Sequence, residues 1–243
     1  TTTLGMKHLV SLLMSLHFAL SVGAQNYETD VIRLRDDSQL KITFIGHGSL
    51  VFTYNDKVIY IDPAATTADF ANMPQGALLV YTHHHGDHFD IPTAQKLSSK
   101  ETIIVGSKDV ISALQRGEVM NNGDTRTYLG DITIEAVAAY NTTEGHTKFH
   151  PKGRDNGYIF VIGGSRIYVA GDSEPIEEMS QLGEIDIAFL PVNQPYTMTI
   201  EQALEAVKMI QPKIFYPYHF SDTPVETLKE RLSETAVEVR LRD

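Results

Sequence analysis

Short apolar runs recur along the chain from about position 40 onward, and most have the length and composition of β-strands. They are rich in Ile, Val, Tyr and Phe and are bounded by Gly, Pro, Asn or Asp. We expect strands at 41–45, 57–61, 77–82, 102–106, 132–140, 158–162, 165–170, 185–192 and 213–218. Strands therefore dominate the predicted framework.

Two turns join neighbouring strands into predicted hairpins. Asn55 and Asp56 lie between the runs 41–45 and 57–61, which predicts a hairpin from Thr43 to Ile61. Gly163 and Gly164 separate two apolar runs and predict a second hairpin, because glycine readily adopts the positive φ angles of tight turns.

Helical periodicity is confined to segments between the strands. Thr199, with Gln202 three residues later, forms a capping-box pattern ahead of a helix through position 210. Thr223 as the cap, Pro224 at the first helical position and Glu226 at the third predict another helix through position 232. Hairpins followed by strand-plus-helix units favour an α/β or α+β fold with helices outside the sheets.

Composition and charge narrow the classes of partner. The 243 residues are 42% hydrophobic and 21% charged, as in an ordinary globular protein. With 31 acidic against 20 basic residues, the net charge of -11 disfavours a nucleic-acid partner. The chain has no cysteine, so any metal must be held by nitrogen and oxygen ligands. These features are compatible with a homo-oligomer.

The first residues have the pattern of an export signal. Lys7 precedes an apolar stretch from Leu9 to Val22, and the small residues Val22 and Ala24 suit a cleavage before Gln25. We expect a signal peptide over 1–24 and a periplasmic or secreted domain over 25–243. The alternative is an N-terminal helix packed on a cytoplasmic protein. The apolar stretch is too short for a stable membrane span.

The segment LLVYTHHHGDHFD, residues 78–90, places histidines directly after a predicted buried strand. Alternate side chains of an extended segment share a face, so His83 and His85 point the same way and can meet one cation. His84 points oppositely, which favours a packing role or a position behind the residues that hold the cation.

Gly86 then permits a bend that turns Asp87 and His88 toward a second cation nearby. Exposed histidines without a metal are the alternative. The preceding core strand and the included aspartate favour metal binding.

The motif THHHGDHFD resembles the T-H-x-H-x-D-H signature of metallo-β-lactamase-fold hydrolases. The stretches IGHGSLVFTYNDKVIYIDP, FHPKGRDNGYIF, RIYVAGDSE and FYPYHF resemble further landmarks of that family in the same order, particularly its ascorbate-phosphate-lactonase-like branch. The resemblance extends from Leu40 to the end of the sequence. It implies a four-layer αββα sandwich.

The resemblance also implies which residues hold metal. His83, His85 and a third histidine would bind the first ion. Asp87, His88 and His219 would bind the second, and Asp172 would bridge both. The third histidine is His150 or His146; we favour His150 because the lactonase-like branch has a similar FHPKG segment, whereas other members present this ligand as G-H-T, as around His146.

Five more residues are assigned outside the ligand sets. Asp62 resembles a buried aspartate that braces the histidine loop from behind the metal ligands. His47, Lys152, Arg154 and Tyr196 are candidates for contacting substrate, the two basic residues by meeting an anionic substituent.

The implied activity is hydrolysis by a metal-bound hydroxide, with two divalent ions per chain. Zinc suits the ligands best, and manganese or iron remain alternatives. Asp87 would orient the nucleophile and pass a proton. The expected substrate is a small ester, either a lactone or a phosphorylated lactone. A small-molecule phosphodiesterase and a non-catalytic metal-binding protein on the same fold are the alternatives.

Overall fold

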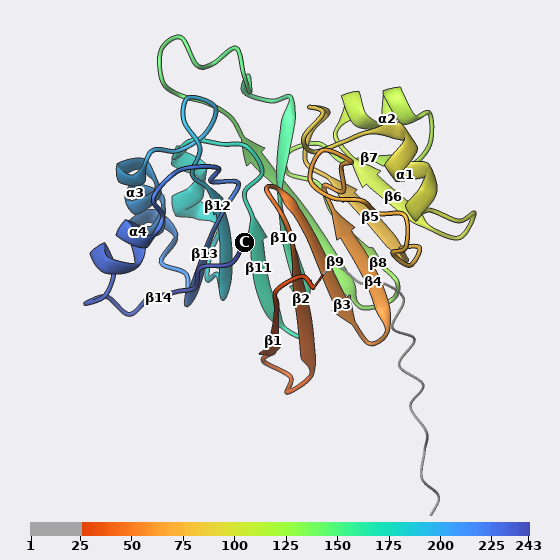
Figure 1. Cartoon of the computed structure of the whole chain (residues 1–243), viewed down its shortest axis with the longest axis horizontal. Helices are drawn as coiled ribbons and strands as arrows, with labels where there is room; N and C mark the ends of the chain where they lie inside the picture. The colour runs from red at the N-terminus through yellow and green to blue at the C-terminus, as the bar shows by residue number, and fades with distance from the viewer. Residues whose placement is uncertain (1–25) are drawn as a thin grey trace, which may run out of the picture.

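Two seven-stranded β-sheets packed face to face form the centre of the protein, as a computed structural model that describes residues 26–243 shows (Figure 1). The strands of one sheet lie side by side in the order β1 to β7, and those of the other sheet in the order β14 to β8. The first sheet comprises β1 (Thr29–Arg33), β2 (Gln39–Gly46), β3 (Ser49–Tyr54), β4 (Lys57–Ile61), β5 (Leu78–Tyr81), β6 (Ile103–Gly106) and β7 (Glu118–Val119). The second comprises β8 (Thr125–Tyr128), β9 (Ile132–Ala139), β10 (Asp155–Ile162), β11 (Ser165–Val169), β12 (Ile187–Pro191), β13 (Ile214–Tyr218) and β14 (Glu238–Val239).

Each sheet changes from antiparallel to parallel pairing halfway across. Strands β1 to β4 pair antiparallel, and β4 to β7 pair parallel. In the second sheet β8 to β11 pair antiparallel, and β11 to β14 pair parallel. The parallel strands end at a common edge of their sheet, where the loops that follow them can meet.

The main core lies between the sheets because alternate strand residues point inward. Along β2, Leu40, Ile42 and Phe44 are buried. Phe44 contacts Tyr216 of the opposite sheet with ring centroids 5.1 Å apart. Complete burial of one such apolar side chain stabilises the fold by about 1.5–3 kcal/mol. Apolar residues of both sheets therefore form one cluster between them.

Helices cover both outer faces, which gives the four layers (Figure 1). Helices α1 (Ile91–Leu97) and α2 (Lys108–Leu114) pack on the first sheet, where Leu97 and Val110 join a cluster with Tyr81. The short 3₁₀ helix η1 (Glu177–Gln181) and helices α3 (Ile200–Ile210) and α4 (Glu226–Arg231) cover the second. The predicted αββα fold class is confirmed. No helix in residues 26–243 is long and apolar enough to cross a membrane.

The two predicted helix starts had different outcomes. At α3 the capping box is present: Gln202 N donates to Thr199 Oγ1 at 3.0 Å, and Thr199 N donates to Gln202 Oε1 at 2.9 Å. The prediction of Thr223 as the cap of α4 is wrong. The chain there first makes a tight turn, with Thr227 N donating to Pro224 O, and regular helix begins at Glu226 without a side-chain cap.

The turn predictions were also partly corrected. Asn55 and Asp56 do form a turn, both with positive φ, but it joins β4 to β3. The predicted direct pairing of 41–45 with 57–61 is wrong because β3 lies between them. The Gly163–Gly164 hairpin between β10 and β11 is confirmed. The prediction for residues 1–24 falls outside the described residues.

Candidate metal centre

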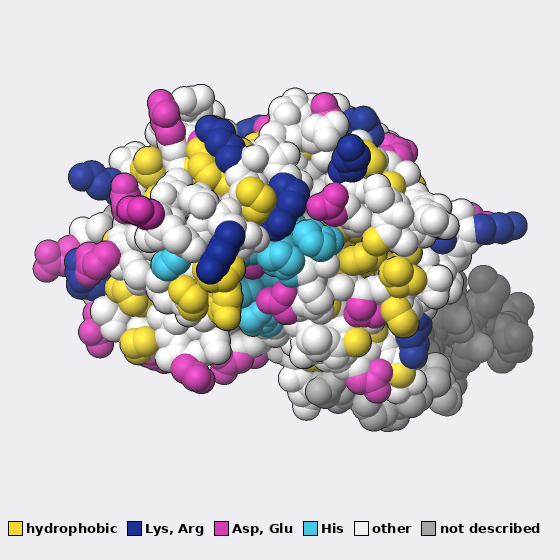
Figure 2. All heavy atoms as spheres, turned by 90° about the horizontal axis from the view of Figure 1, so that it is seen from above, with side chains coloured by type: hydrophobic (Ala, Val, Ile, Leu, Met, Phe, Trp, Pro, Cys, Tyr) yellow, Lys and Arg dark blue, Asp and Glu magenta, His cyan; other side chains and the backbone are white. Residues whose placement is uncertain are grey.

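Histidines and carboxylates from distant segments meet at one edge of the sandwich. The loop after β5 carries His83, His85, Asp87 and His88; the loop before β10 carries His150; Asp172 follows β11, His219 follows β13, and His47 lies in the β2–β3 turn. Figure 2 shows histidine side chains gathered near the middle of the upper face, with basic and apolar side chains beside them.

The first group contains the side chains of His83, His85, His150 and Asp172. One potential ligand atom from each lies within 4.8 Å of the others. Asp172 Oδ2 is 3.2 Å from His150 Nε2 and 3.5 Å from His83 Nε2. Three imidazole rings therefore converge beside Oδ2 of Asp172.

The second group contains His47, Asp87, His88 and His219, again with potential ligand atoms within 4.8 Å of one another. The other oxygen of Asp172, Oδ1, is 3.2 Å from His88 Nε2 and 3.4 Å from His219 Nε2. Asp172 therefore directs one carboxylate oxygen toward each group.

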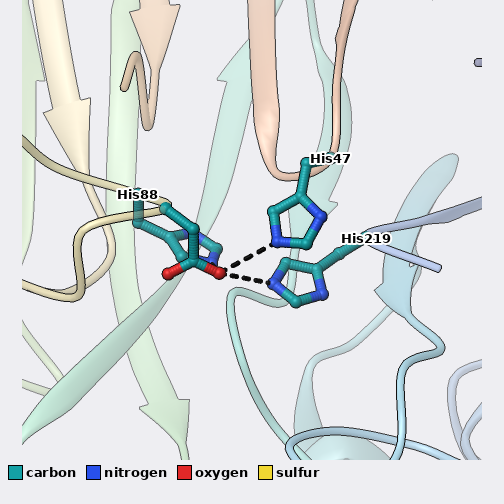
Figure 3. Close-up of side chains that lie close together, drawn as sticks. His47, His88 and His219 are labelled. Atoms are coloured by element: carbon teal, nitrogen blue, oxygen red, sulfur yellow. Dashed lines mark hydrogen bonds and ion pairs between the residues drawn. The ribbon is translucent and has the colours of Figure 1, made fainter. Parts of the chain in front are cut away.

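The rings of His47 and His219 both lie close to the carboxylate of Asp87. Their ring centroids are 3.6 Å apart, and Figure 3 shows the two rings side by side facing the position of His88. Asp87 Oδ2 is 2.9 Å from His47 Nε2 and 3.3 Å from His219 Nε2. The side chain of Asp87 is 40% exposed, so this corner of the site can be reached from solvent.

The polar atoms at the centre fit a bound cation. Nε2 of His83, His88 and His150 and Oδ1 of Asp172 are buried without a hydrogen-bond partner. A buried polar atom left unpaired costs about 1–3 kcal/mol, so four such atoms turned toward one another indicate ligands rather than core packing. Imidazole nitrogen and carboxylate oxygen are the donors that divalent transition metals take.

Hydrogen bonds behind the ligands fix which imidazole nitrogen faces the centre. Asp62 Oδ2 is 2.8 Å from His88 Nδ1, and Asp62 Oδ1 accepts from Thr82 N at 2.7 Å. His83 Nδ1 is 2.9 Å from Thr82 Oγ1. With Nδ1 engaged outward, Nε2 is left for a metal. The structure thus places Asp62 behind the histidine loop.

Burial and charge set the protonation of the centre. Burial lowers the pKa of His83 and, together with neighbouring His83 and His150, lowers that of His85 to about 4. Burial alone would lower the pKa of His88, but the carboxylates of Asp172 and Asp62 raise it well above its usual range. Burial alone would raise the pKa of Asp172, but the surrounding histidines hold it well below its usual value. His83 and His85 are therefore held neutral and Asp172 ionised, which are the forms that bind a metal ion.

Among the histidines of residues 26–243, two lie outside both groups. His146 Nδ1 is 3.8 Å from Glu174 Oε1, and His84 Nδ1 is 3.7 Å from Asp109 Oδ2. The structure thus brings His150, and not His146, together with His83 and His85.

The two basic candidates for substrate contact have other partners. Lys152 Nζ is 3.2 Å from Glu178 Oε1 and has 68% of its side chain exposed. Arg154 makes two hydrogen bonds to the buried carboxylate of Asp155, at 2.7 and 2.8 Å, and donates to Phe149 O. Arg154 therefore braces the loop that carries His150.

A cavity of about 270 Å³ borders the second group at His47 and His219, and Tyr196 is not among the residues that line it. The Tyr196 ring is 47% exposed and meets Phe149 edge-on at 5.0 Å. The cavity is lined by Phe44, Gly46, His47, Ser49, Leu50, Tyr218, His219, Phe220, Ser221, Arg242 and Asp243. A small molecule at the metal centre therefore has mainly apolar walls beside His47 and His219.

Sequence reasoning missed two buried residues, Asn141 and Glu174. Asn141 Oδ1 lies 2.6 Å from His150 Nδ1, and its amide nitrogen donates to Glu174. The one available signal was that Glu174 stands two positions after Asp172 in a segment of buried residues.

A family model of the β-lactamase superfamily domain matches residues 41–219, which include every residue of both groups. The chain belongs to the β-lactamase superfamily. The chain is 30% identical over 218 residues to a metal-dependent hydrolase of Thermus thermophilus, and the match covers 82% of this chain and 94% of that protein. It is 30% identical over 192 residues to a metal-dependent hydrolase of Nanoarchaeum equitans, covering 76% and 86%.

Solved structures agree. The superfamily member superposes on a Parabacteroides distasonis protein, provisionally assigned as a metal-dependent hydrolase, with a TM-score of 0.87 and 46% identity over 89% of this chain and 99% of that one. Igni18, a metallo hydrolase of Ignicoccus hospitalis, gives 0.70 at 24% identity, over 84% and 95%, and supports the fold alone. The chain is a metal-dependent hydrolase of the metallo-β-lactamase fold.

Proposed function

We propose that the protein binds two divalent cations and hydrolyses a small ester, either a lactone or a phosphorylated lactone. The observation that carries the two-cation proposal is the carboxylate of Asp172, whose two oxygens face different sets of histidines at 3.2–3.5 Å. A carboxylate offers lone pairs on both oxygens and can therefore serve two cations at once.

The two groups supply the ligands. His83, His85, His150 and Asp172 would hold the first cation. Asp87, His88 and His219 of the second group would hold the second cation, together with Oδ1 of Asp172, which lies 3.2 and 3.4 Å from the two histidines. Zinc is the metal that mixed imidazole and carboxylate ligands suit best, with manganese or iron as alternatives. The bracing contacts of Asp62 and Asn141 would keep the Nε2 atoms in place for either metal.

Bound cations of this kind lower the pKa of water and polarise the bond under attack. Asp87, partly exposed, would orient the attacking water and later pass a proton to the leaving group. His47 Nε2 is 2.9 Å from Asp87 Oδ2, so His47 can hold or relay that proton and contact the substrate.

The surroundings favour a small substrate. The apolar cavity beside His47 and His219 measures about 270 Å³, which suits a small carbon skeleton. The branch resemblance supports a lactone. Lys152 and Arg154 already pair with Glu178 and Asp155, so their contacts do not favour an anionic substituent over an uncharged one. The acidic net charge of -11 weighs against a polyanionic substrate such as RNA.

Elemental analysis with a hydrolysis panel tests the proposal. We expect about two metal ions per chain, and hydrolysis of a small lactone or phosphorylated lactone that chelation abolishes and added zinc restores. Hydrolysis at the full rate without metal would exclude the mechanism. Faster hydrolysis of a small phosphodiester than of any lactone would favour the phosphodiesterase alternative. Full metal content without turnover on the panel would indicate a non-catalytic metal-binding protein.

A further inference from the structure

Glu174 is a buried carboxylate that belongs to neither ligand group. No Lys or Arg of the described residues pairs with it, and His146 Nδ1 is 3.8 Å from its Oε1, beyond hydrogen-bond distance. It lies two residues after Asp172 and is fully buried. Its Oε1 accepts from Asn141 Nδ2 at 2.8 Å, and its Oε2 accepts from Thr143 N at 3.1 Å and Gln202 Nε2 at 3.0 Å. Such a set of neutral donors around one buried carboxylate needs an explanation.

Glu174 determines the orientation of the Asn141 amide. The Nδ2 group of Asn141 faces two acceptors, Glu174 Oε1 and Tyr196 O, each at 2.8 Å. Neither an ionised carboxylate nor a backbone carbonyl can donate, so the nitrogen of this amide must lie on that side. Its oxygen must then face His150, where Oδ1 is 2.6 Å from Nδ1.

The carboxylate form of Glu174 is favoured by its contacts. Oε2 accepts from the backbone N–H of Thr143, which can only donate, and Oε1 accepts from the Asn141 amide. Glu174 therefore acts as an acceptor at both oxygens.

The amide oxygen in turn determines the form of His150. An amide oxygen only accepts, so Nδ1 of His150 must carry the hydrogen that joins them. Nε2 is then the nitrogen with the free lone pair, and it lies 3.2 Å from Asp172 Oδ2. Asn141 also holds the same loop through its backbone, because Asn141 N donates to His150 O at 2.9 Å.

We propose that Glu174, acting through Asn141, is a positioning residue that fixes His150 with Nδ1 protonated and Nε2 directed at the first cation. The inference rests on the proposed function, because the first cation group is part of it. Glu174 would then affect the affinity for metal although it contacts neither metal nor substrate.

The test replaces Glu174 by its amide. In Glu174→Gln one acceptor oxygen becomes a donor and faces the donors of Thr143, Gln202 or Asn141. We expect the affinity for one of the two zinc ions, measured by competition with a chelator, to fall by about 10–100-fold while the other is unchanged. Glu135→Gln is the matched control: Glu135 pairs with Arg166 at 2.7 Å, away from the site, and should leave both affinities unchanged.

A second measurement separates positioning from a loss of stability. In the zinc-loaded, ¹⁵N-labelled protein, we expect His150 Nδ1–H to give a slowly exchanging proton signal, which Glu174→Gln loses or exchanges faster. The signal is assigned by its absence in His150→Gln. If Glu174→Gln does not fold, Thr143→Val replaces it, because that variant removes only one hydroxyl donor to Glu174; a smaller loss at the same zinc site is then expected.

Two failures can be told apart. Unmodified protein that binds fewer than two zinc ions would refute the two-cation proposal itself. Unmodified protein with two zinc ions, together with a folded variant that keeps both affinities and the slow His150 signal, would overturn the role of Glu174 alone. A signal showing His150 protonated at Nε2 would also overturn it.

Discussion

The carboxylate of Asp62 lies 2.8 Å from Nδ1 of His88, and both side chains are completely buried. Asp62 also accepts from the backbone and the hydroxyl of Thr82, at the start of the histidine loop. One buried carboxylate thus fixes both the path of the loop and the orientation of a ligand ring. Metal-ligating histidines commonly depend on such a partner.

Asp62→Asn should weaken metal binding and the fold together. The amide keeps one acceptor oxygen but presents a donor to Thr82 or His88, so at least one buried hydrogen bond is lost. We expect a loss of about 1–3 kcal/mol in the free energy of unfolding, measured with urea on metal-free protein. Affinity for zinc should fall about 10–100-fold. Asp56→Asn, in the exposed β3–β4 turn, is the control, and equal affinities in both variants would contradict the bracing role.

Local pattern predicted those parts of the fold that local chemistry determines. The Gly163–Gly164 turn and the capping box of Thr199 and Gln202 depend on neighbours a few residues apart. Strand β1 was not predicted, because only alternate residues are partly buried and it is held by distant contacts, such as Asp30 with Arg242 at 2.8 Å. Helices α1 and α2 have seven residues each, too few for a clear periodicity.

The same distinction applies to the site. The spacing of His83, His85, Asp87 and His88 could be interpreted from one loop, since extended geometry puts His83 and His85 on one face and a bend at Gly86 turns Asp87 and His88 away. The partnership of Asn141 with Glu174 joins residues 33 positions apart and leaves no local pattern. Such contacts become visible only when both sheets are assembled.

Asp87→Ala and Asp172→Ala should lose different amounts of metal. Asp87 approaches only the second group, at 3.3 Å from His219 Nε2, whereas Asp172 approaches histidines of both. We expect Asp87→Ala to abolish turnover with about one ion retained, and Asp172→Ala to lose affinity for both. Elemental analysis after dialysis checks this. Equal occupancy in the two variants would remove the distinction between a bridging and a terminal carboxylate.

His150→Ala should remove the first cation and nearly all activity, and His146→Ala should keep both ions. His150 is 1% exposed and lies 3.2 Å from Asp172 Oδ2, whereas His146 lies beside Glu174 and outside both groups. Metal content and hydrolysis of each purified variant decide the matter. The reverse pattern would assign the ligand to His146 and weaken the lactonase-like resemblance, while the superfamily membership would stand.

Acidification should destabilise the metal-free protein partly through His85. Its pKa is about 4 in the folded protein, against about 6.5 for an unperturbed histidine. Between these values the unfolded chain binds more protons than the folded one, so the free energy of unfolding rises with pH. Stability from this residue is therefore complete above about pH 6.5 and is lost as the pH falls toward 4.

His85→Gln isolates that contribution, because glutamine does not titrate. Urea unfolding of metal-free protein at several values between pH 4 and pH 7 should give a steeper loss of stability on acidification for the unmodified chain than for the variant. The sign follows from burial: desolvation and the neighbouring rings of His83 and His150 oppose a proton on His85 in the folded state only. If the two proteins lost stability in parallel, His85 would be equally easy to protonate folded and unfolded, and its packing against the first group would have to be abandoned.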